Sequence, residues 1–181
     1  MNNLILIRHG QSIWNLERRF TGWADVDLTD HGKSEAKYAG QLIKKLNIEF
    51  DVYFTSVQIR AIDTLEIILD ILNKKNSEIK KAWELNERHY GALTGLNKDE
   101  MMKKLGKKQI HIFRRSWNVP PPTMKKTHPN HPSKNKTYIN IPTDKMPDSE
   151  SLKNTFERVM PYYKKNIKPL LSSNKNILIA A

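Results

Sequence analysis

The chain has 181 residues, a formal net charge of +12 and no cysteine. This length is typical of one domain, and the missing cysteines exclude disulfides and thiolate metal sites. No apolar stretch is long enough to span a membrane, and residues 1–3 lack the features of a signal peptide, so we expect a cytoplasmic protein. The charge attracts anions: nucleic acid, anionic lipid or phosphorylated metabolites. Many of the lysines come in pairs typical of solvated helix faces, so charge alone does not identify the partner.

Strands and helices alternate in the predicted first half of the chain. The apolar run at residues 4–8 predicts a buried strand. Thr29 or Asp30 is placed to cap a helix that continues to about Leu46. Residues 50–56 read as a second strand, and residues 59–72 as a second amphipathic helix.

Shorter elements and a long loop are predicted next. Asn97, followed by Glu100, resembles a capping box for a helix that stops near Gly106. Prolines 120–122 end the helical stretch that follows. Residues 123–148 have no periodic apolar pattern, which predicts a long exposed loop.

The last part of the chain predicts one helix and one strand. Ser149 or Ser151 is placed to cap a helix that runs to about Lys165, with Pro161 as a kink or break. Residues 176–181 form another buried apolar run. The alternation predicts a single α/β domain over 1–181: a three-layer sandwich whose mostly parallel sheet carries helices on both faces.

The most informative segment is the turn after the first strand, where Arg8 and His9 precede Gly10. Ligands of open α/β sheets bind at the carboxyl ends of the strands. A guanidinium binds phosphate or carboxylate through two parallel hydrogen bonds, and a neutral imidazole is a nucleophile. The pair therefore indicates an enzyme that forms a phosphohistidine.

Other candidate residues lie further along the chain, each with a structural alternative. Arg60 follows the second strand and is either a second phosphate ligand or a surface ion-pair partner. Glu87 is either a group that exchanges protons with a substrate hydroxyl or a salt-bridge partner. His128 and His131 have the spacing of two metal ligands without a third, so we expect no metal site there.

Together these segments resemble the cofactor-dependent phosphoglycerate mutases of the histidine phosphatase superfamily. The segments that carry the resemblance are residues 4–15, 20–29, 53–60, 85–98 and 114–122. The turn at residues 8–10 is shared with phosphatase relatives, whereas residues 87–98 and 114–116 favour a mutase. The expected reaction interconverts 3-phosphoglycerate and 2-phosphoglycerate in glycolysis and gluconeogenesis.

The resemblance also implies roles for individual residues. His9 would be the phosphorylated nucleophile, Glu87 the proton donor and acceptor, and Arg8 and Arg60 the groups that hold the transferring phosphoryl. The remaining substrate-binding candidates are Gly10, Gln11, Ser12, Asn15, Thr21, Gly22, Arg88, Tyr90, Lys98, Arg114 and Arg115. The priming phosphodonor would be 2,3-bisphosphoglycerate, with no metal, because the arginines supply the positive charge.

The sequence also allows two other functions. A bisphosphoglycerate mutase or phosphatase would carry the same residues, and a non-catalytic anion-binding module would show salt-dependent affinity for nucleic acid. We expect neither nucleic acid nor membrane as the partner, and a possible homodimer or homotetramer. The family pattern continues past the last strand into a second His-Gly motif, so we also expect a polypeptide that is cut short at Ala181.

Overall fold

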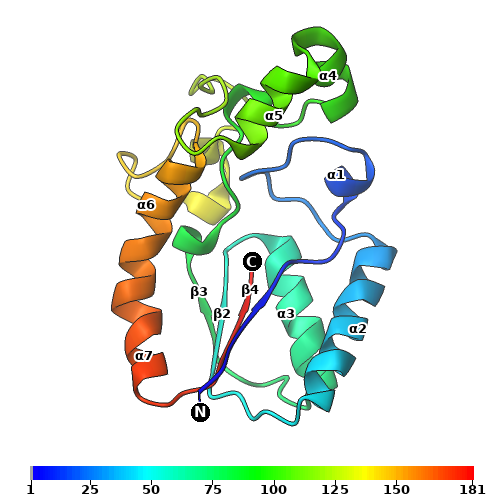
Figure 1. Ribbon diagram of the computed structural model, residues 1–181, viewed down its shortest axis with the longest axis vertical. Helices are drawn as coiled ribbons and strands as arrows, with labels where there is room; N and C mark the ends of the chain where they lie inside the picture. Colours follow the sequence, from blue (N-terminus) through cyan, green and yellow to red (C-terminus); the bar gives the residue numbers. More distant parts are fainter. Residues whose placement is uncertain (1) are drawn as a thin grey trace. The chain divides into compact units, whose positions relative to one another are not determined.

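The computed structural model describes residues 2–181 and contains a four-stranded parallel sheet (Figure 1). The strands are β1 (Leu4–Ile7), β2 (Val52–Thr55), β3 (Ile79–Lys81) and β4 (Ile177–Ala180). Their order is β1-β4-β2-β3, so the last strand in the sequence pairs with both β1 and β2. All three strand pairs are parallel, which confirms the predicted sheet type.

Helices pack on both faces of this sheet (Figure 1). On one face, α2 (Asp30–Lys45) and α3 (Ile59–Ile71) bury an apolar cluster that includes Leu65 and Leu178. On the other face, Ile177 and Ile179 of β4 pack against the C-terminal helical segments. Every residue of β4 is buried, as expected for a central strand covered on both sides. The predicted three-layer α/β class is confirmed.

The C-terminal helix is longer than the sequence pattern predicts. It consists of α6 (Leu152–Tyr162), a π-helical segment (Tyr163–Ile167) and α7 (Lys168–Ser172). Ser151 accepts a hydrogen bond from the Asn154 N–H (3.3 Å), so the predicted cap is confirmed. The chain stays helical through Pro161, and the irregularity takes the form of a wide turn immediately after it.

β3 is the element that the sequence pattern misses. Lys80 and Lys81 are one of the lysine pairs that we expected on solvated helix faces, but they belong to this strand and pair with Phe54 and Thr55. Three residues with only one apolar side chain are too short to show the period-two alternation of a strand.

The described chain divides into two compact units. The first comprises residues 1–13, 26–86 and 160–181, and holds the sheet with α2 and α3. The second comprises residues 14–25 and 87–159. It contains most of α1 (Ile13–Leu16), α4 (Lys98–Leu105), α5 (Lys107–Arg115) and most of α6. The single-domain interpretation of the sequence stays a prediction.

The second unit has its own core, which includes Phe20, Leu93 and Ile110. It also holds residues 123–148, which contain only the short 3₁₀ turns Pro132–Lys134 and Lys136–Tyr138. The expectation that this segment is exposed is wrong for Met124 and Tyr138, which are fully buried, whereas Ile139 is exposed. The Tyr138 hydroxyl donates to the Trp23 carbonyl (2.7 Å), which ties the segment to its unit.

No helix within residues 2–181 combines the length and the apolar character that a membrane span requires.

Candidate active site

The turn after β1 is held at its backbone by the end of β4. The His9 N–H donates to the Ala181 carbonyl (3.1 Å), and the Ala181 N–H donates to the Ile7 carbonyl (3.0 Å). These two bonds continue the parallel ladder one step beyond the strands. His9 therefore sits at the carboxyl edge of the sheet, where the sequence predicts it.

Two glycines allow this turn to lie directly against the start of α2. A Cβ built on Gly10 would overlap the Gly32 carbonyl oxygen, and one built on Gly32 would overlap the Gln11 carbonyl oxygen. The N-cap of α2 strengthens the contact, because Thr29 accepts from the Gly32 N–H (3.0 Å) and its own N–H donates to Gln11 (2.9 Å). The predicted cap at Thr29 is thus confirmed, and it also fixes the turn.

The imidazole of His9 is buried, with 8% of the residue exposed, and both ring nitrogens have partners. Nδ1 lies 2.7 Å from the Gly10 carbonyl oxygen. Because a carbonyl only accepts, Nδ1 carries the proton. Nε2 accepts a hydrogen bond from Nε of Arg60 (3.2 Å). This tautomer leaves the lone pair on Nε2, the nitrogen that would attack phosphorus.

Burial is the main cause that lowers the pKa of His9 from 6.5 to about 4, and the positive charges of Arg60 and Arg8 act in the same direction. The hydrogen bond with Gly10 opposes them. The ring is therefore neutral near pH 7, which is the form a nucleophile needs.

We expect His9 to remain neutral and unprotonated at Nε2 above about pH 5 and to gain its proton only as the pH falls through about 4. Unfolded chains protonate this group near 6.5. Between those values the unfolded state binds more protons, so His9 makes the fold less stable as the pH falls from about 6.5 towards about 4. A ¹⁵N NMR titration of the imidazole measures this directly. A measured His9 pKa above 6 would contradict this prediction.

Arg60 is fully buried in the first turn of α3 and is held at several atoms. Its Nη2 donates to Oε1 of Gln58 (2.9 Å) while its Nε points at His9. Thr64 joins Arg60 to the turn, since its hydroxyl donates to the Arg60 carbonyl (2.7 Å) and accepts from the Gly10 N–H (3.1 Å). The first unit thus brings Arg60 and His9 together. The surface ion-pair alternative for Arg60 is wrong.

Gln58 and Thr64 are site-supporting residues that the sequence reasoning missed. Their spacing from Arg60 is the available signal, because Thr64 lies one helical turn after it and Gln58 is the N-cap residue of α3. The remaining candidates in this unit differ in how far they are buried. Arg8 is exposed, Gln11 donates through its N–H to Glu35 (2.7 Å), and Ser12 is buried beside Leu28.

The second unit gathers another group of candidates around Arg88. Its Nη2 donates to the Arg114 carbonyl (2.6 Å), and its guanidinium lies 4.9 Å from the centre of the Tyr90 ring. Within the described residues, Nη1 of Arg88 and Nε of Arg114 are buried without a hydrogen-bond partner. Buried cationic donors of this kind fit an oxyanion such as a carboxylate or phosphate.

The other candidates of this unit differ in how closely they pack against Arg88, Tyr90 and Arg114. Gly22, at φ +55°, packs so tightly on Tyr90 that a Cβ would lie 3.0 Å from the Tyr90 nitrogen. Thr21 is buried beside it, and its hydroxyl has no hydrogen-bond partner within residues 2–181. Lys98 lies over the Phe20 ring (5.8 Å). Asn15 is half-buried, and Arg115 is exposed at the end of α5.

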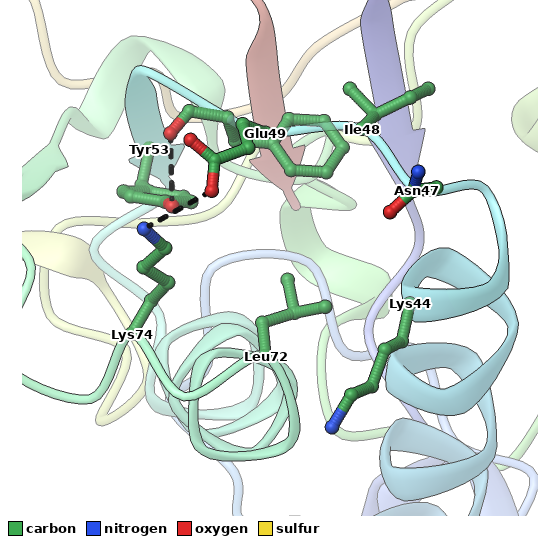
Figure 2. Close-up of a pocket in the computed structure, with 8 residues that line it drawn as sticks. Lys44, Asn47, Ile48, Glu49, Tyr53, Leu72 and Lys74 are labelled. Atoms are coloured by element: carbon green, nitrogen blue, oxygen red, sulfur yellow. Dashed lines mark hydrogen bonds and ion pairs between the residues drawn. The ribbon is translucent and has the colours of Figure 1, made fainter.

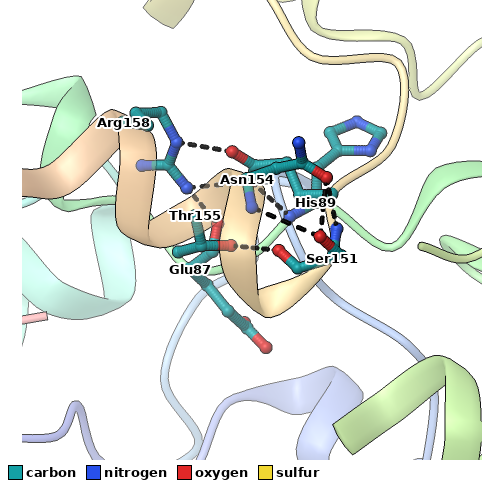
Figure 3. Close-up of polar contacts among 7 residues, drawn as sticks. Glu87, His89, Ser151, Asn154, Thr155 and Arg158 are labelled. Atoms are coloured by element: carbon teal, nitrogen blue, oxygen red, sulfur yellow. Dashed lines mark hydrogen bonds and ion pairs between the residues drawn. The ribbon is translucent and has the colours of Figure 1, made fainter. Parts of the chain in front are cut away.

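Glu87 lies one residue before Arg88. Its side chain points away from the polar contacts made by Arg158 and the start of α6 (Figure 3). Its carbonyl oxygen accepts from Nη2 of Arg158 (3.4 Å). His131, in the predicted loop, is buried, and its Nε2 lies 2.8 Å from Oδ1 of Asp148.

A small surface pocket of about 140 Å³ lies in the first unit (Figure 2). It contains none of the candidate residues and is lined by Lys44, Asn47, Ile48, Glu49, Phe50, Tyr53, Leu72 and Lys74. Its two lysines already have partners, since Lys44 donates to the Ile71 carbonyl (3.1 Å) and Lys74 pairs with Glu49 (3.9 Å). The pocket therefore offers no free cationic group to an anion.

Comparison with known proteins agrees with the geometry of the His9 turn. Residues 4–130 match the model of the histidine phosphatase superfamily (branch 1), and the chain belongs to that superfamily. Over all 181 residues it is 55% identical to the 2,3-bisphosphoglycerate-dependent phosphoglycerate mutase of Pelagibacter ubique (strain HTCC1062), of which it covers 76%. It is 51% identical to the protein of the same name from Hydrogenobaculum sp. (strain Y04AAS1), of which it covers 73%. The resemblance inferred from the sequence is confirmed.

Solved structures support the fold. Phosphoglycerate mutase from Bacillus anthracis str. Sterne superimposes with a TM-score of 0.71 at 21% identity, over 99% of this chain and 74% of that one. A mycobacterial glucosyl-3-phosphoglycerate phosphatase in complex with VO3 gives a TM-score of 0.71 at 17% identity, over 100% of this chain and 76% of that one. The same fold thus carries proteins named as mutase and as phosphatase.

Proposed function

We propose that this protein is a 2,3-bisphosphoglycerate-dependent phosphoglycerate mutase that interconverts 3-phosphoglycerate and 2-phosphoglycerate through a phosphohistidine. One observation carries the proposal: a buried, neutral His9 whose Nδ1–H is fixed by Gly10 and whose Nε2 lone pair faces the Arg60 guanidinium. The whole-length identity to two proteins of that name supports the choice of reaction.

In this mechanism Nε2 of His9 forms the bond to phosphorus as the bond from phosphorus to the donor oxygen breaks. Arg60 and Arg8 stabilise the negative charge of the transferring group. Glu87 gives its proton to the oxygen that leaves and takes one from the hydroxyl that attacks phosphohistidine in the next half-reaction. The cofactor 2,3-bisphosphoglycerate supplies the first phosphoryl group.

The unpartnered donors of Arg88 and Arg114 are suited to the charged groups of the substrate that do not react. Such groups hold the phosphoglycerate while its two oxygens exchange the phosphoryl. Thr21, Gly22, Tyr90 and Lys98 complete the proposed binding set, together with Asn15, Arg115 and the turn residues Gly10, Gln11 and Ser12.

The proposed glycolytic reaction also implies a cytoplasmic enzyme whose partner is a small phosphorylated acid rather than nucleic acid or a membrane. In this proposal the +12 charge attracts the anionic substrate. A homodimer or homotetramer is the proposed assembly.

A ³¹P NMR assay of the protein with 3-phosphoglycerate and a trace of 2,3-bisphosphoglycerate tests the reaction. We expect 2-phosphoglycerate to accumulate to equilibrium with little inorganic phosphate. Release of phosphate in step with substrate loss would instead identify a phosphatase. An unchanged substrate would overturn the proposal and favour an anion-binding protein.

A further inference from the structure

A buried ion pair lies behind Glu87, outside every motif used to predict the site. Arg158 of α6 and Glu150, just before that helix, have side chains only 7% and 3% exposed. They meet through two hydrogen bonds, from Nε to Oε1 (2.7 Å) and from Nη2 to Oε2 (2.9 Å). The guanidinium also lies over the Trp23 ring at 5.3 Å. This bidentate geometry fixes the orientation of the arginine fork.

The Arg158–Glu150 pair is hydrogen-bonded to the backbone of residues 87–89, which carries the Glu87 side chain (Figure 3). Nη2 of Arg158 donates to the Glu87 carbonyl (3.4 Å), and Oε2 of Glu150 accepts from the His89 N–H (2.9 Å). The Glu150 N–H also donates to the His89 carbonyl (3.0 Å). Three backbone groups across residues 87–89 are therefore bonded to Glu150 or Arg158, a link between segments far apart in the sequence.

Hydrogen bonds in the first turn of α6 fix the chain between Glu150 and Arg158. Ser151 accepts from the Asn154 N–H (3.3 Å) and donates to the Asn154 side-chain oxygen (2.7 Å), and Thr155 bonds the Ser151 carbonyl (3.1 Å) (Figure 3). The segment between Glu150 and Arg158 is thus fixed within the same unit.

We propose that Arg158 and Glu150 are positioning residues for Glu87, which set the place of its carboxylate by fixing its main chain. This inference rests on the proposed function, in which Glu87 transfers the proton. An apolar pair could fill the same space with similar stability. What the charged pair adds is a guanidinium that donates a hydrogen bond to the Glu87 carbonyl. Displacing a catalytic group by about 1 Å can cost about a hundredfold in rate.

The test separates positioning from folding with two variants. Arg158→Met leaves the Glu150 carboxylate buried and unpaired, so we expect a lower Tm and a lower kcat. In the double variant Glu150→Gln with Arg158→Met, the amide oxygen keeps an acceptor for the His89 N–H and no unpaired charge remains. We expect its Tm to return to within about 3 °C of the wild type, while kcat stays about 10- to 100-fold low and KM changes less than about threefold.

Lys153→Met is the matched control, because it removes a lysine of the same helix whose ion pair with Glu157 is exposed. It should leave kcat, KM and Tm unchanged. A double variant that regains both the Tm and the kcat of the wild type would overturn the positioning role and leave the proposed function intact. A wild-type protein without mutase activity would overturn the proposed function and this inference with it.

Discussion

Replacing His9 by alanine is expected to abolish phosphoenzyme formation and mutase turnover completely. The imidazole is the group whose neutral Nε2 lone pair faces Arg60, and its Nδ1–H is fixed by Gly10. An alanine methyl group provides no nucleophile, and the neighbouring arginines stay protonated and cannot replace it. The loss should therefore be a loss of the reaction itself rather than of substrate affinity.

Intact mass spectrometry after incubation with 2,3-bisphosphoglycerate measures this outcome. The wild-type protein should gain one acid-labile phosphate and the His9→Ala variant none. His31→Ala is the matched control, because this histidine is exposed on α2, where it lies 3.4 Å from Glu35. This variant should gain the phosphate like the wild type. Acid-labile phosphate on the His9→Ala variant would refute His9 as the nucleophile.

Arg60→Lys is expected to lower kcat by roughly a hundredfold to a thousandfold, the usual cost of removing one donor that stabilises a developing charge. Arg60 uses two different nitrogens at once, Nε on His9 and Nη2 on Gln58. A lysine ammonium is a single point of charge on a flexible stem and cannot hold both positions. The charge is kept, so any loss reports on geometry.

Steady-state kinetics with a thermal melt checks this prediction. The proper control is Arg18→Lys, since Arg18 also makes a two-nitrogen contact, with Asp99 (2.5 and 2.8 Å), but on the exposed surface. That variant should retain normal kcat. Turnover of Arg60→Lys within about twofold of the wild type would place Arg60 outside the chemistry.

The sequence predicts the strong periodic elements well, because their burial is repeated along the chain. The strands around residues 4–8 and 176–181 and the helix capped by Thr29 all form close to their predicted bounds. His9 and Arg60 could be paired in advance, because both follow parallel strands whose carboxyl ends share an edge. Their contact at 3.2 Å confirms that reasoning.

Features that depend on contacts between distant segments could not be predicted in the same way. Nothing near Glu150 or Arg158 in the sequence indicates that both contact residues 87–89, because these hydrogen bonds join segments far apart in the chain. Residues 123–148 look exposed by composition, yet Tyr138 is buried through its contact with Trp23. Single buried side chains in irregular backbone leave no period to detect.

β3 has a consequence for how the protein behaves in solution. It is an outer strand of the four-stranded sheet, and the backbone edge of an outer strand can recruit a strand from another molecule and start aggregation. Lys80 and Lys81 are both exposed on this strand. Two adjacent positive charges repel a second copy of the strand, and three residues offer few backbone groups for pairing. We therefore expect these two lysines to keep the outer edge of the sheet from pairing with a second molecule.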